Sequence, residues 1–345
     1  MSEPARKLAI VLFNLGGPDK PESVRPFLRN LFRDPAIIQA PGPIREMLAW
    51  LISTLRDKSA RENYAKMGGG SPIMPETLKQ AEALNAAVSA ELEGWEIKIW
   101  PAMRYWHPFT EDVAKEVKQW GADEVVLLPL YPQFSTTTTG SSLKAWRDAG
   151  GESARIVGCY PLQEDFIQAH ADLIRKTWED AGKPENCRVL YSAHGLPKKI
   201  VDAGDPYQWQ VEQTCAAVAE RLPELTDWQV CYQSRVGPLE WIGPSTEDAI
   251  EGAGKDKKAI LLTPIAFVSE HIETLVELDE EYLELAEEHG VETYLRVPAL
   301  GDHPHYIRAL SKLVLDVLSR KADTPSCEGR RICPAGFSAC PCREA

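Results

Sequence analysis

The sequence predicts an α/β protein of two similar doubly wound domains, each built around a parallel sheet of four strands. Short apolar runs alternate with helix-like segments along the chain, which is the pattern of βα units. Most of these runs end in a loop rich in glycine or proline. The four runs of the second half match those of the first half one by one, which indicates an internal repeat.

The candidate strands follow one another in the same series in both halves. In the first half they are residues 7–18 (KLAIVLFNLGGP), 95–108 (WEIKIWPAMRYWHP), 123–141 (DEVVLLPLYPQFSTTTTGS) and 154–161 (ARIVGCYP). In the second half they are residues 187–197 (CRVLYSAHGLP), 228–241 (WQVCYQSRVGPLEW), 257–274 (KKAILLTPIAFVSEHIET) and 293–304 (TYLRVPALGDHP). We expect the domains to cover 1–160 and 161–302, followed by a C-terminal helix over 303–325 and a cysteine-rich tail over 326–345.

The first domain carries an insertion at about residues 34–73. The first two runs start 88 residues apart in the first half (7 to 95) and 41 apart in the second (187 to 228). The front of the surplus is apolar, with basic residues interspersed. It is either a helical insertion packed on its own domain or an apolar lip over residues 34–58. Such a lip would contact a flat hydrophobic ligand and a membrane surface.

Composition narrows the class of protein. The chain has 345 residues, 44% of them hydrophobic, and a net charge of -13. Such a charge argues against nucleic acid as the main partner and favours a cationic ligand. The N-terminus does not resemble a signal peptide and no apolar stretch is long enough to span a bilayer, so we expect a cytoplasmic protein.

Ligands of open α/β sheets bind beyond the carboxyl ends of the strands, so the loops that follow the apolar runs are the places to look. Neither the dinucleotide motif nor the P-loop motif occurs. His194 follows a run directly. Such a histidine is usually structural, but its neutral imidazole can ligate a metal or act as a base.

Glu273 follows the third run of the second half and opens an acidic stretch. Residues 269–288 hold nine carboxylates, one histidine (His271) and no lysine or arginine. In a regular α-helix the six glutamates at 270, 273, 277, 281, 284 and 288 lie within an arc of about 80°. This is either a solvated face or a strip that carries cations or protons, with Glu277 and Glu281 as steps beyond Glu273. A π-type bulge would change which carboxylates align.

The tail contains four of the eight cysteines. Cys333, Cys340 and Cys342 have the spacing C-x6-C-x-C, and Cys327 precedes them. Three such thiols suit a zinc or iron–sulfur site if a fourth ligand is supplied, whereas the alternative is a disordered tail with incidental thiols.

Several long motifs in order resemble the ferrochelatases, which insert iron(II) into a porphyrin at the end of haem synthesis. The main ones are VLYSAHGLPKKIVDAGDPY (189–207), YQSRVGPLEWIGP (232–244) and PIAFVSEHIETLVELDEEY (264–282). Shorter ones are FNLGGP (13–18), GGGSPI (68–73), MRYWHP (103–108) and YPQFSTTTTGSSL (131–143). The resemblance extends to about residue 320. It implies two Rossmann-like domains of the chelatase type with a cleft between them.

The resemblance also implies the roles of individual residues. His194 and Glu273 match the pair that binds iron, and it is open whether His194 ligates iron or accepts a pyrrole proton. His271 and Glu277 continue the acidic side. The positions that match the porphyrin pocket are Leu15, Arg104, Tyr131 and Trp241.

A 2Fe–2S cluster is the cofactor that the resemblance implies for the tail. The animal enzymes take an internal ligand from the loop where this chain has Thr136, so the spacing fits the bacterial members better. We therefore expect ligation by Cys159, Cys333, Cys340 and Cys342, with Cys327 as the rival fourth ligand.

The expected reaction joins Fe2+ and protoporphyrin IX to give protohaem and two protons. Alternatives are a chelatase for coproporphyrin III or another metal, and a non-catalytic haem or iron–sulfur sensor. A proton acceptor opposite an acidic strip favours catalysis, because a haem binder does not need one. We expect a cytoplasmic enzyme that is peripheral to the inner face of the membrane if the lip touches lipid.

Overall fold

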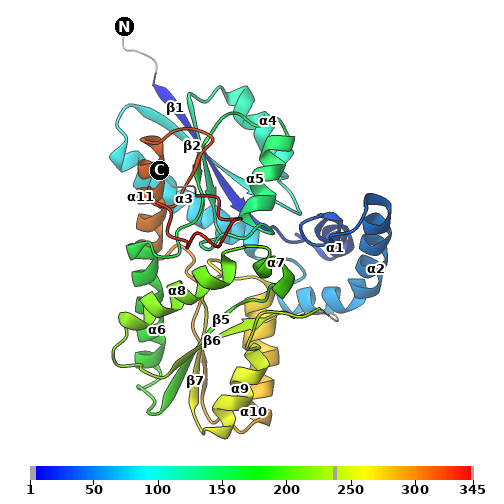
Figure 1. Cartoon of the computed structure of the whole chain (residues 1–345), viewed down its shortest axis with the longest axis vertical. Coiled ribbons are helices and arrows are strands. Elements are labelled where there is room, and N and C mark those ends of the chain that lie inside the picture. Colours follow the sequence, from blue (N-terminus) through cyan, green and yellow to red (C-terminus); the bar gives the residue numbers. More distant parts are fainter. Residues whose placement is uncertain (1–4, 236–238, 343–345) are drawn as a thin grey trace. The chain divides into compact units, whose positions relative to one another are not determined.

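The computed structural model describes residues 5–235 and 239–342, and the chain divides into two compact units (Figure 1). The first unit comprises Met1–Tyr131, Ser135–Gly158 and Leu310–Gly329. The second comprises Pro132–Phe134, Cys159–Ala309 and Arg330–Ala345. Each unit contains one sheet in which all described strands are parallel.

The sheet of the first unit has the strand order β2-β1-β3-β4-β9. Its strands are β1 (Arg6–Asn14), β2 (Trp95–Met103), β3 (Glu124–Pro129), β4 (Arg155–Val157) and β9 (Pro325–Ser326). All side chains of β1 from Leu8 to Phe13 are fully buried. Burial on both faces explains why this run is continuously apolar and does not alternate with polar residues.

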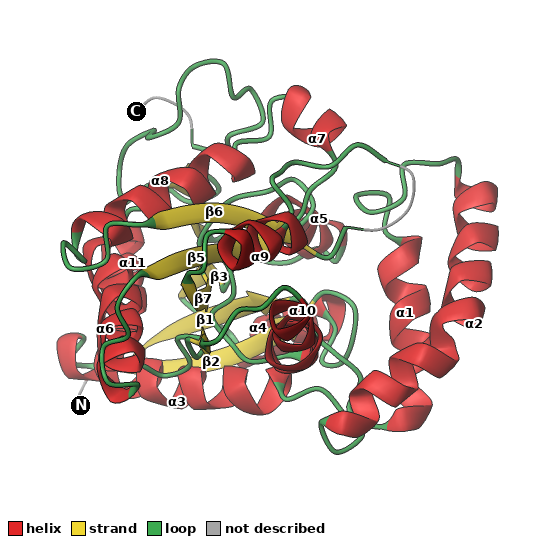
Figure 2. Cartoon of the chain, turned by 90° about the horizontal axis from the view of Figure 1, so that it is seen from below, coloured by secondary structure: helices red, strands yellow, loops and turns green. Residues whose placement is uncertain are grey.

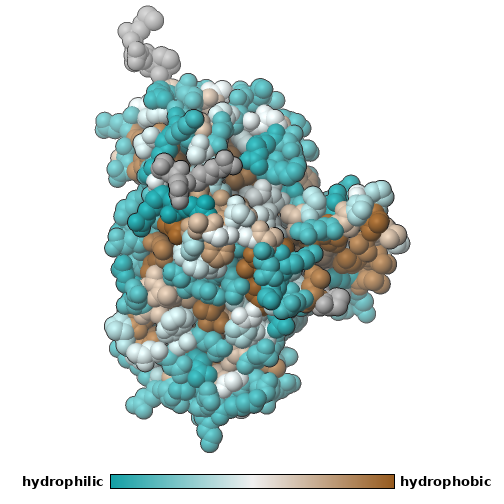
Figure 3. Space-filling view, in the orientation of Figure 1, coloured by the Kyte–Doolittle hydropathy of each residue, from teal (hydrophilic) through white to brown (hydrophobic). Residues whose placement is uncertain are grey.

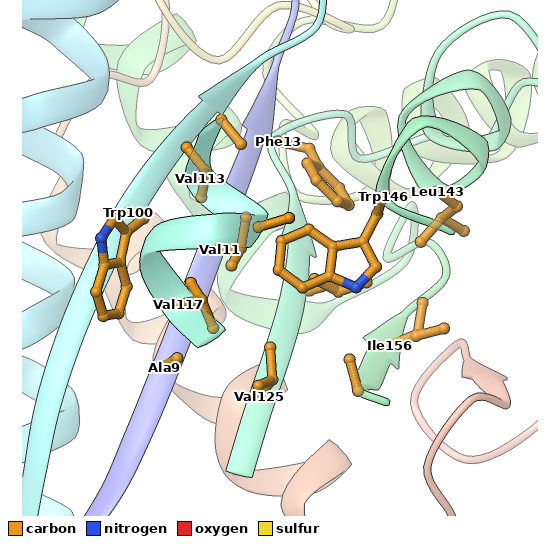
Figure 4. Close-up of a cluster of buried hydrophobic side chains, with 14 residues drawn as sticks. Ala9, Val11, Phe13, Trp100, Val113, Val117, Val125, Leu143, Trp146 and Ile156 are labelled. Atoms are coloured by element: carbon orange, nitrogen blue, oxygen red, sulfur yellow. The ribbon is translucent and has the colours of Figure 1, made fainter. Parts of the chain in front are cut away.

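Helices cover the first sheet and extend away from it. They are η1 (Pro21–Ser23), α1 (Val24–Arg33), α2 (Gly42–Lys66), α3 (Ile73–Glu91), α4 (Thr110–Trp120) and α5 (Thr139–Asp148). On one face, Val113 and Val117 of α4 and Trp146 of α5 pack with the β1 side chains (Figure 4). The rings of Phe13 and Trp146 meet edge to face at 6.4 Å, a favourable geometry for aromatic pairs.

The sheet of the second unit has the strand order β6-β5-β7-β8. Its strands are β5 (Cys187–His194), β6 (Trp228–Gln233), β7 (Ala259–Pro264) and β8 (Tyr294–Arg296). The other elements are α6 (Glu164–Asp180), α7 (Lys198–Asp202), α8 (Tyr207–Glu220), α9 (Thr246–Lys255), the π-helix η2 (Glu273–Glu281) and α10 (Tyr282–Glu288) (Figure 2). The helix α11 (Pro304–Leu318) begins in the second unit and continues, from Leu310, in the first. Side chains of α9, η2 and α10 form one core with β5, β6 and β7.

The predicted fold class is confirmed, because both units have the same order of their first four strands. The first sheet differs from the prediction in having a fifth strand, β9, from the C-terminal region. The N–H of Gly158 donates to the carbonyl of Ser326 at 2.7 Å, and that of Asp323 donates to the carbonyl of Ala154 at 2.7 Å. A strand of only two residues, Pro325 and Ser326, has no apolar run that would reveal it.

The predicted insertion contains the long helix α2, which lies beside α1 (Figures 1 and 2). Hydrophobic side chains gather on the surface there (Figure 3). The exposed ones are Ile37, Ile44, Met47, Trp50, Leu51 and Leu55. No helix in the described part of the chain is long and apolar enough to cross a membrane.

Candidate active site

Polar side chains lie at or beyond the carboxyl ends of three neighbouring strands of the second unit. His194 is the last residue of β5, and Gln233 is the last residue of β6. The loop after β7 leads through His271 to Glu273, the first residue of η2. Since β6, β5 and β7 are parallel neighbours, their carboxyl ends meet at one edge of the sheet, the usual ligand-binding edge of this fold.

His194, Glu273 and His271 form a contact group at this edge. The Nδ1 atom of His194 lies 3.2 Å from Oε2 of Glu273, and Nε2 of His271 lies 3.6 Å from the same oxygen. The side chain of His194 is 42% exposed and that of Glu273 is 26% exposed. The two predicted principal residues are therefore adjacent and accessible to a ligand.

The two histidines change the ionisation of Glu273, and Glu273 changes that of His194 in return. Burial alone would raise the pKa of Glu273, but His194 and His271 hold it well below its ordinary value. Burial alone would lower the pKa of His194, but the carboxylates of Glu273 and Glu277 raise it above its ordinary value. The pair therefore favours an ionised Glu273 next to an imidazole of increased basicity.

Glu277 is held by four hydrogen bonds from three residues that the sequence analysis did not identify. Its Oε2 accepts from Nε2 of Gln233 at 3.0 Å and from Oγ of Ser234 at 2.7 Å. Its Oε1 accepts from the N–H of Ser234 and from the hydroxyl of Tyr282, each at 3.0 Å. The second hydrogen of the Gln233 amide reaches the carbonyl of Glu273 at 3.1 Å. Gln233 thus connects consecutive turns of η2.

The missed residues differ in how far the sequence could have revealed them. Gln233 and Ser234 directly follow an apolar run, so the rule that led to His194 applies equally to them. Ser234 has a φ of +60°, which is uncommon for a residue other than glycine. Tyr282 has no sequence signal, because only the π-helical turn of η2 brings its hydroxyl to Glu277, five residues earlier.

Glu273 and Glu277 have pKa values displaced in opposite directions. Burial and the charge of Glu273 raise the pKa of Glu277, in spite of its hydrogen-bond donors, whereas that of Glu273 is lowered. Two carboxylates with such different pKa values suit different tasks, Glu273 as a fixed negative charge and Glu277 as a proton carrier.

The expected regular α-helix over the acidic stretch is wrong, because residues 273–281 form a π-helix. The arc of about 80° calculated for an α-helix therefore does not apply across this segment. Glu281, the expected third step of the acidic strip, is exposed at the end of η2. Its side chain makes no hydrogen bond or ion pair in the residues described.

Part of the negative charge of the acidic stretch is neutralised by a residue outside it. Arg296, at the end of β8, binds Asp279 through two nitrogens at 2.6 and 2.8 Å and Glu270 at 2.5 Å. Burial alone would raise the pKa of Glu270, but Arg296 holds this pKa below its ordinary value. The compensating charge comes from a different strand, so the stretch alone could not show it.

The residues predicted for the porphyrin pocket lie at strand ends in both units. In the first unit, Leu15 follows β1 and Tyr131 follows β3. Arg104 follows β2, and its N–H donates to the carbonyl of Asn14 at 2.9 Å. In the second unit, Trp241 forms an isolated bridge with Pro197, three residues after His194.

Arg104 is fixed by residues that the sequence did not reveal. Its Nη2 lies 2.7 Å from Oδ2 of Asp34, which is buried, and its Nε donates to Oγ of Ser141 at 2.7 Å. Tyr105 and Ser141 also donate to that Asp34 oxygen, at 2.8 and 2.6 Å. A hollow of about 420 Å³ in the first unit is lined in part by Arg33, Asp34 and Arg104. Asp34 thus orients Arg104.

The second unit contains the four preferred cluster ligands, all of them buried: Cys159, Cys333, Cys340 and Cys342. The Nε2 atom of Gln210 lies 3.4 Å from the sulfur of Cys159 and 3.1 Å from that of Cys333. The sulfurs of Cys159 and Cys342 are within 4.8 Å of each other. A hydrogen bond with Cys333 lowers the pKa of Cys340 to about 6, in spite of burial. Cys159, Cys333 and Cys340 are present as thiols, whereas Cys342 is disulfide-bonded in this structure. Three buried thiols, one of them with a stabilised thiolate, fit a thiolate-bound metal group.

Comparison with protein families gives a match over nearly the whole chain. The family model described as Ferrochelatase matches residues 7–318. The chain is 61% identical to a ferrochelatase of Caulobacter vibrioides (strain NA1000 / CB15N), over 98% of each chain. It is 58% identical to one of Hyphomonas neptunium, over 97% of this chain and 95% of that one. It is 49% identical to one of Rickettsia bellii, over 98% and 95%.

Two solved structures support the fold. SirB from Bacillus subtilis with Fe3+ aligns with a TM-score of 0.50 and 14% identity over 91% of this chain and 96% of that one. CbiX, described as the terminal enzyme of sirohaem biosynthesis in denitrifying bacteria, aligns with a TM-score of 0.51 and 15% identity over 92% and 100%. At this level of identity the comparison supports the chelatase-type fold only.

Proposed function

The chain belongs to the ferrochelatase family, and we infer from this that it inserts iron(II) into protoporphyrin IX, releasing two protons and forming protohaem. The observation that carries the inference is the identity of 61% over 98% of both chains. The adjacent His194 and Glu273 supply chemistry that this reaction needs.

We propose that iron(II) binds between His194 and Glu273. Imidazole and carboxylate donors suit a divalent ion that must later be released, because thiolates would bind soft metals more tightly. The separation of 3.2 Å between Nδ1 and Oε2 is close to the distance between two donors that share one metal ion. The same contact would also support His194 as the acceptor of a pyrrole proton, since Glu273 stabilises the imidazolium.

Protons released from the porphyrin need an exit, and the geometry favours Glu277. Its raised pKa allows it to take up a proton at higher pH than an ordinary glutamate. Tyr282 and Ser234 hold the carboxylate in place with hydroxyl groups, which can both donate and accept. We propose that protons pass from His194 or Glu273 to Glu277, without Glu281 as a further fixed step.

The remaining proposed porphyrin contacts are Leu15, Arg104, Tyr131 and Trp241. A free porphyrin is planar and resists metal entry, so an enzyme gains rate if it binds a distorted ring more tightly than a flat one. Large side chains at strand ends can supply such contacts. The support for these four residues is the family resemblance together with their positions after strands.

We propose a 2Fe–2S cluster held by Cys159, Cys333, Cys340 and Cys342, with Cys327 as the alternative fourth ligand. The buried thiols of Cys159, Cys333 and Cys340 support it. When bound, such a cluster supplies a one-electron redox centre, and we assign it no step in the reaction. Absorption spectra of anaerobically purified Cys159→Ser and Cys327→Ser chains separate the two sets. Only loss of the true ligand should remove the visible bands.

We propose that the exposed side chains of α2 touch a membrane surface. Trp50, Met47 and Leu55 are 50%, 59% and 72% exposed, and basic residues such as Arg56 and Lys58 are interspersed. Apolar groups flanked by cations are typical of interfacial helices. Flotation with vesicles that contain anionic lipid tests this, and Trp50→Ser with Leu55→Ser should reduce binding. Equal flotation of the double variant contradicts it.

Anaerobic mixing of the purified chain with Fe2+ and protoporphyrin IX, followed by absorption, tests the function directly. Glu273→Gln and His194→Ala should lower turnover by about 10²- to 10⁴-fold, with porphyrin binding retained. Glu284→Gln, a change of an exposed residue 11 positions after Glu273 in α10, is the matched control and should leave turnover unchanged. Parallel reactions with coproporphyrin III and with Co2+ establish specificity. Porphyrin binding without any metal insertion would overturn the function and favour a sensor protein.

A further inference from the structure

A second group of metal-binding side chains lies in the second unit, on elements that do not form the iron site. It consists of Asp165, His170 and Asp172 on α6 and of His303 and His305 at the start of α11. We propose that this group, with His305 and Asp172 as principal ligands, binds a divalent first-row transition-metal ion.

His305 has the surroundings of a metal-ligating histidine. Its Nδ1 lies 3.2 Å from Oδ1 of Asp165, and its Nε2 lies 3.8 Å from Oδ2 of Asp172. In metal sites a histidine commonly donates one ring N–H to a carboxylate while the other nitrogen holds the ion. Asp165, with a side chain only 8% exposed, would serve as that orienting carboxylate.

Asp172 presents one oxygen to the same space. Its Oδ1 accepts a hydrogen bond from Nε2 of Gln168 at 2.8 Å, which orients the carboxylate. Its Oδ2 faces Nε2 of His305 at a distance too long for a hydrogen bond. Two donors at about 2.1 Å from a tetrahedral ion are about 3.4 Å apart, so a small movement of either side chain would accommodate the ion.

Two further ring nitrogens are buried and lack a hydrogen-bond partner in the residues described. They are Nδ1 of His303 and Nε2 of His170, whose side chain is fully enclosed. The rings of His303 and His305 are stacked, with centroids 6.0 Å apart. Buried polar atoms without partners are uncommon and call for an explanation. Each belongs to a residue two positions before a principal ligand, but among the described residues neither forms a three-donor group within 4.8 Å with His305 and Asp172.

A purely structural role predicts a different set of essential residues. The His305–Asp165 contact could simply join α11 to α6, and Arg308 lies 3.5 Å from the same Asp165 oxygen. That role does not involve Oδ2 of Asp172 or the unpartnered nitrogen of His303. Imidazole and carboxylate together favour Fe2+, Co2+ or Zn2+ over the harder Mg2+ and Ca2+.

Crystals of the full chain soaked in Co2+ provide the first test. We expect an anomalous difference peak between Nε2 of His305 and Oδ2 of Asp172. A peak elsewhere but none at this position would overturn the proposal. The native chain is used here, so a variant that fails to fold cannot affect the outcome.

Calorimetric titration of the full chain with Co2+ provides the second test. Asp172→Asn and His305→Gln should each weaken one binding event at least tenfold, and Asp165→Asn should weaken it about 10- to 100-fold. His194→Ala should leave this event unchanged, which separates it from the proposed iron site. Asp180→Asn, an exposed carboxylate at the end of the same helix, is the matched control. Native-like binding by Asp172→Asn, with an unchanged melting temperature, would contradict the proposal.

Discussion

Arg296 offers a quantitative test of how the acidic stretch is tolerated. Its guanidinium is shared between Asp279, inside η2, and Glu270, which precedes η2. The change Arg296→Gln removes the cation and leaves two partly buried carboxylates without it. Glu270 would keep its hydrogen bond from the N–H of Ala299 at 2.9 Å. We therefore expect destabilisation of the second unit, centred on the segment that carries Glu273.

The expected magnitude follows from the burial of the three side chains. They are 15%, 21% and 32% exposed for Arg296, Glu270 and Asp279. Removing one partner of a buried ion pair costs about 3–5 kcal/mol, and partial exposure places this case near about 3 kcal/mol. For a unit of 150–250 residues, about 1 kcal/mol lowers Tm by roughly 2–4 °C. Arg296→Gln should thus lower the Tm of this unit by about 6–12 °C.

The assay is thermal unfolding followed by circular dichroism, repeated over a range of pH. The pKa of Glu270 is lowered on folding, so its contribution to stability is present above the pKa of the unfolded chain and is lost as pH falls through the folded value. The Tm difference between native and Arg296→Gln should therefore be full at neutral pH and diminish below pH 4.5, the ordinary value for a glutamate.

Lys176→Gln is the matched control, because it removes a cation from the exposed pair with Asp180. Exposed pairs contribute less than about 1 kcal/mol, so this change should lower Tm by only a few degrees. Equal Tm values for native and Arg296→Gln chains would refute the compensation argument. A difference that persists unchanged into acid would show that the loss comes from packing instead of charge.

Three further predictions concern the iron site. Glu273→Gln removes the carboxylate that raises the pKa of His194. The NMR titration of His194 and the acidic limb of the pH–rate profile should therefore both move to lower pH. If neither moves, Glu273 does not influence the ionisation of His194. Gly195→Ala places a Cβ 2.8 Å from the carbonyl oxygen of Gln233 and 3.2 Å from Trp241. This crowding should lower the free energy of unfolding by about 1–3 kcal/mol, measured by thermal unfolding, and reduce turnover. Gly252→Ala, where the space is open, is the control and should do neither. Tyr282→Phe removes a 3.0 Å hydrogen bond to Glu277 and should cost about 1.5–3 kcal/mol in urea unfolding at neutral pH; unchanged stability would show that water replaces the hydroxyl.

Much of the fold followed from the pattern of apolar runs. The apolar run at 7–18 was predicted to contain a strand of a parallel sheet, and Leu8 to Phe13 are fully buried in a strand inside that sheet. The repetition of the runs predicted the shared strand order of the two units. The short strand β9 did not follow, because Pro325 and Ser326 join the sheet only through backbone hydrogen bonds.

The same contrast holds for the site. The position of His194 and Glu273 after strands identified them, since parallel strands bring their carboxyl ends to one edge. Tyr282 and Arg296 could not be identified in this way. Tyr282 reaches Glu277, five residues earlier, through the π-helical turn of η2. Arg296 reaches Asp279 only because the tertiary structure brings β8 next to η2.

The sequence by itself determined the α/β class, the repeat and the chemical types at the strand ends, because these depend on local apolar patterns and on the geometry of parallel strands. The tertiary structure alone decided that residues 273–281 form a π-helix, that Arg296 compensates Asp279 within this helix and Glu270 before it, and that Gln210 meets the sulfurs of Cys159 and Cys333. Charge and hydrogen bonding act through space, so a count of charges along one segment cannot include a partner supplied by another.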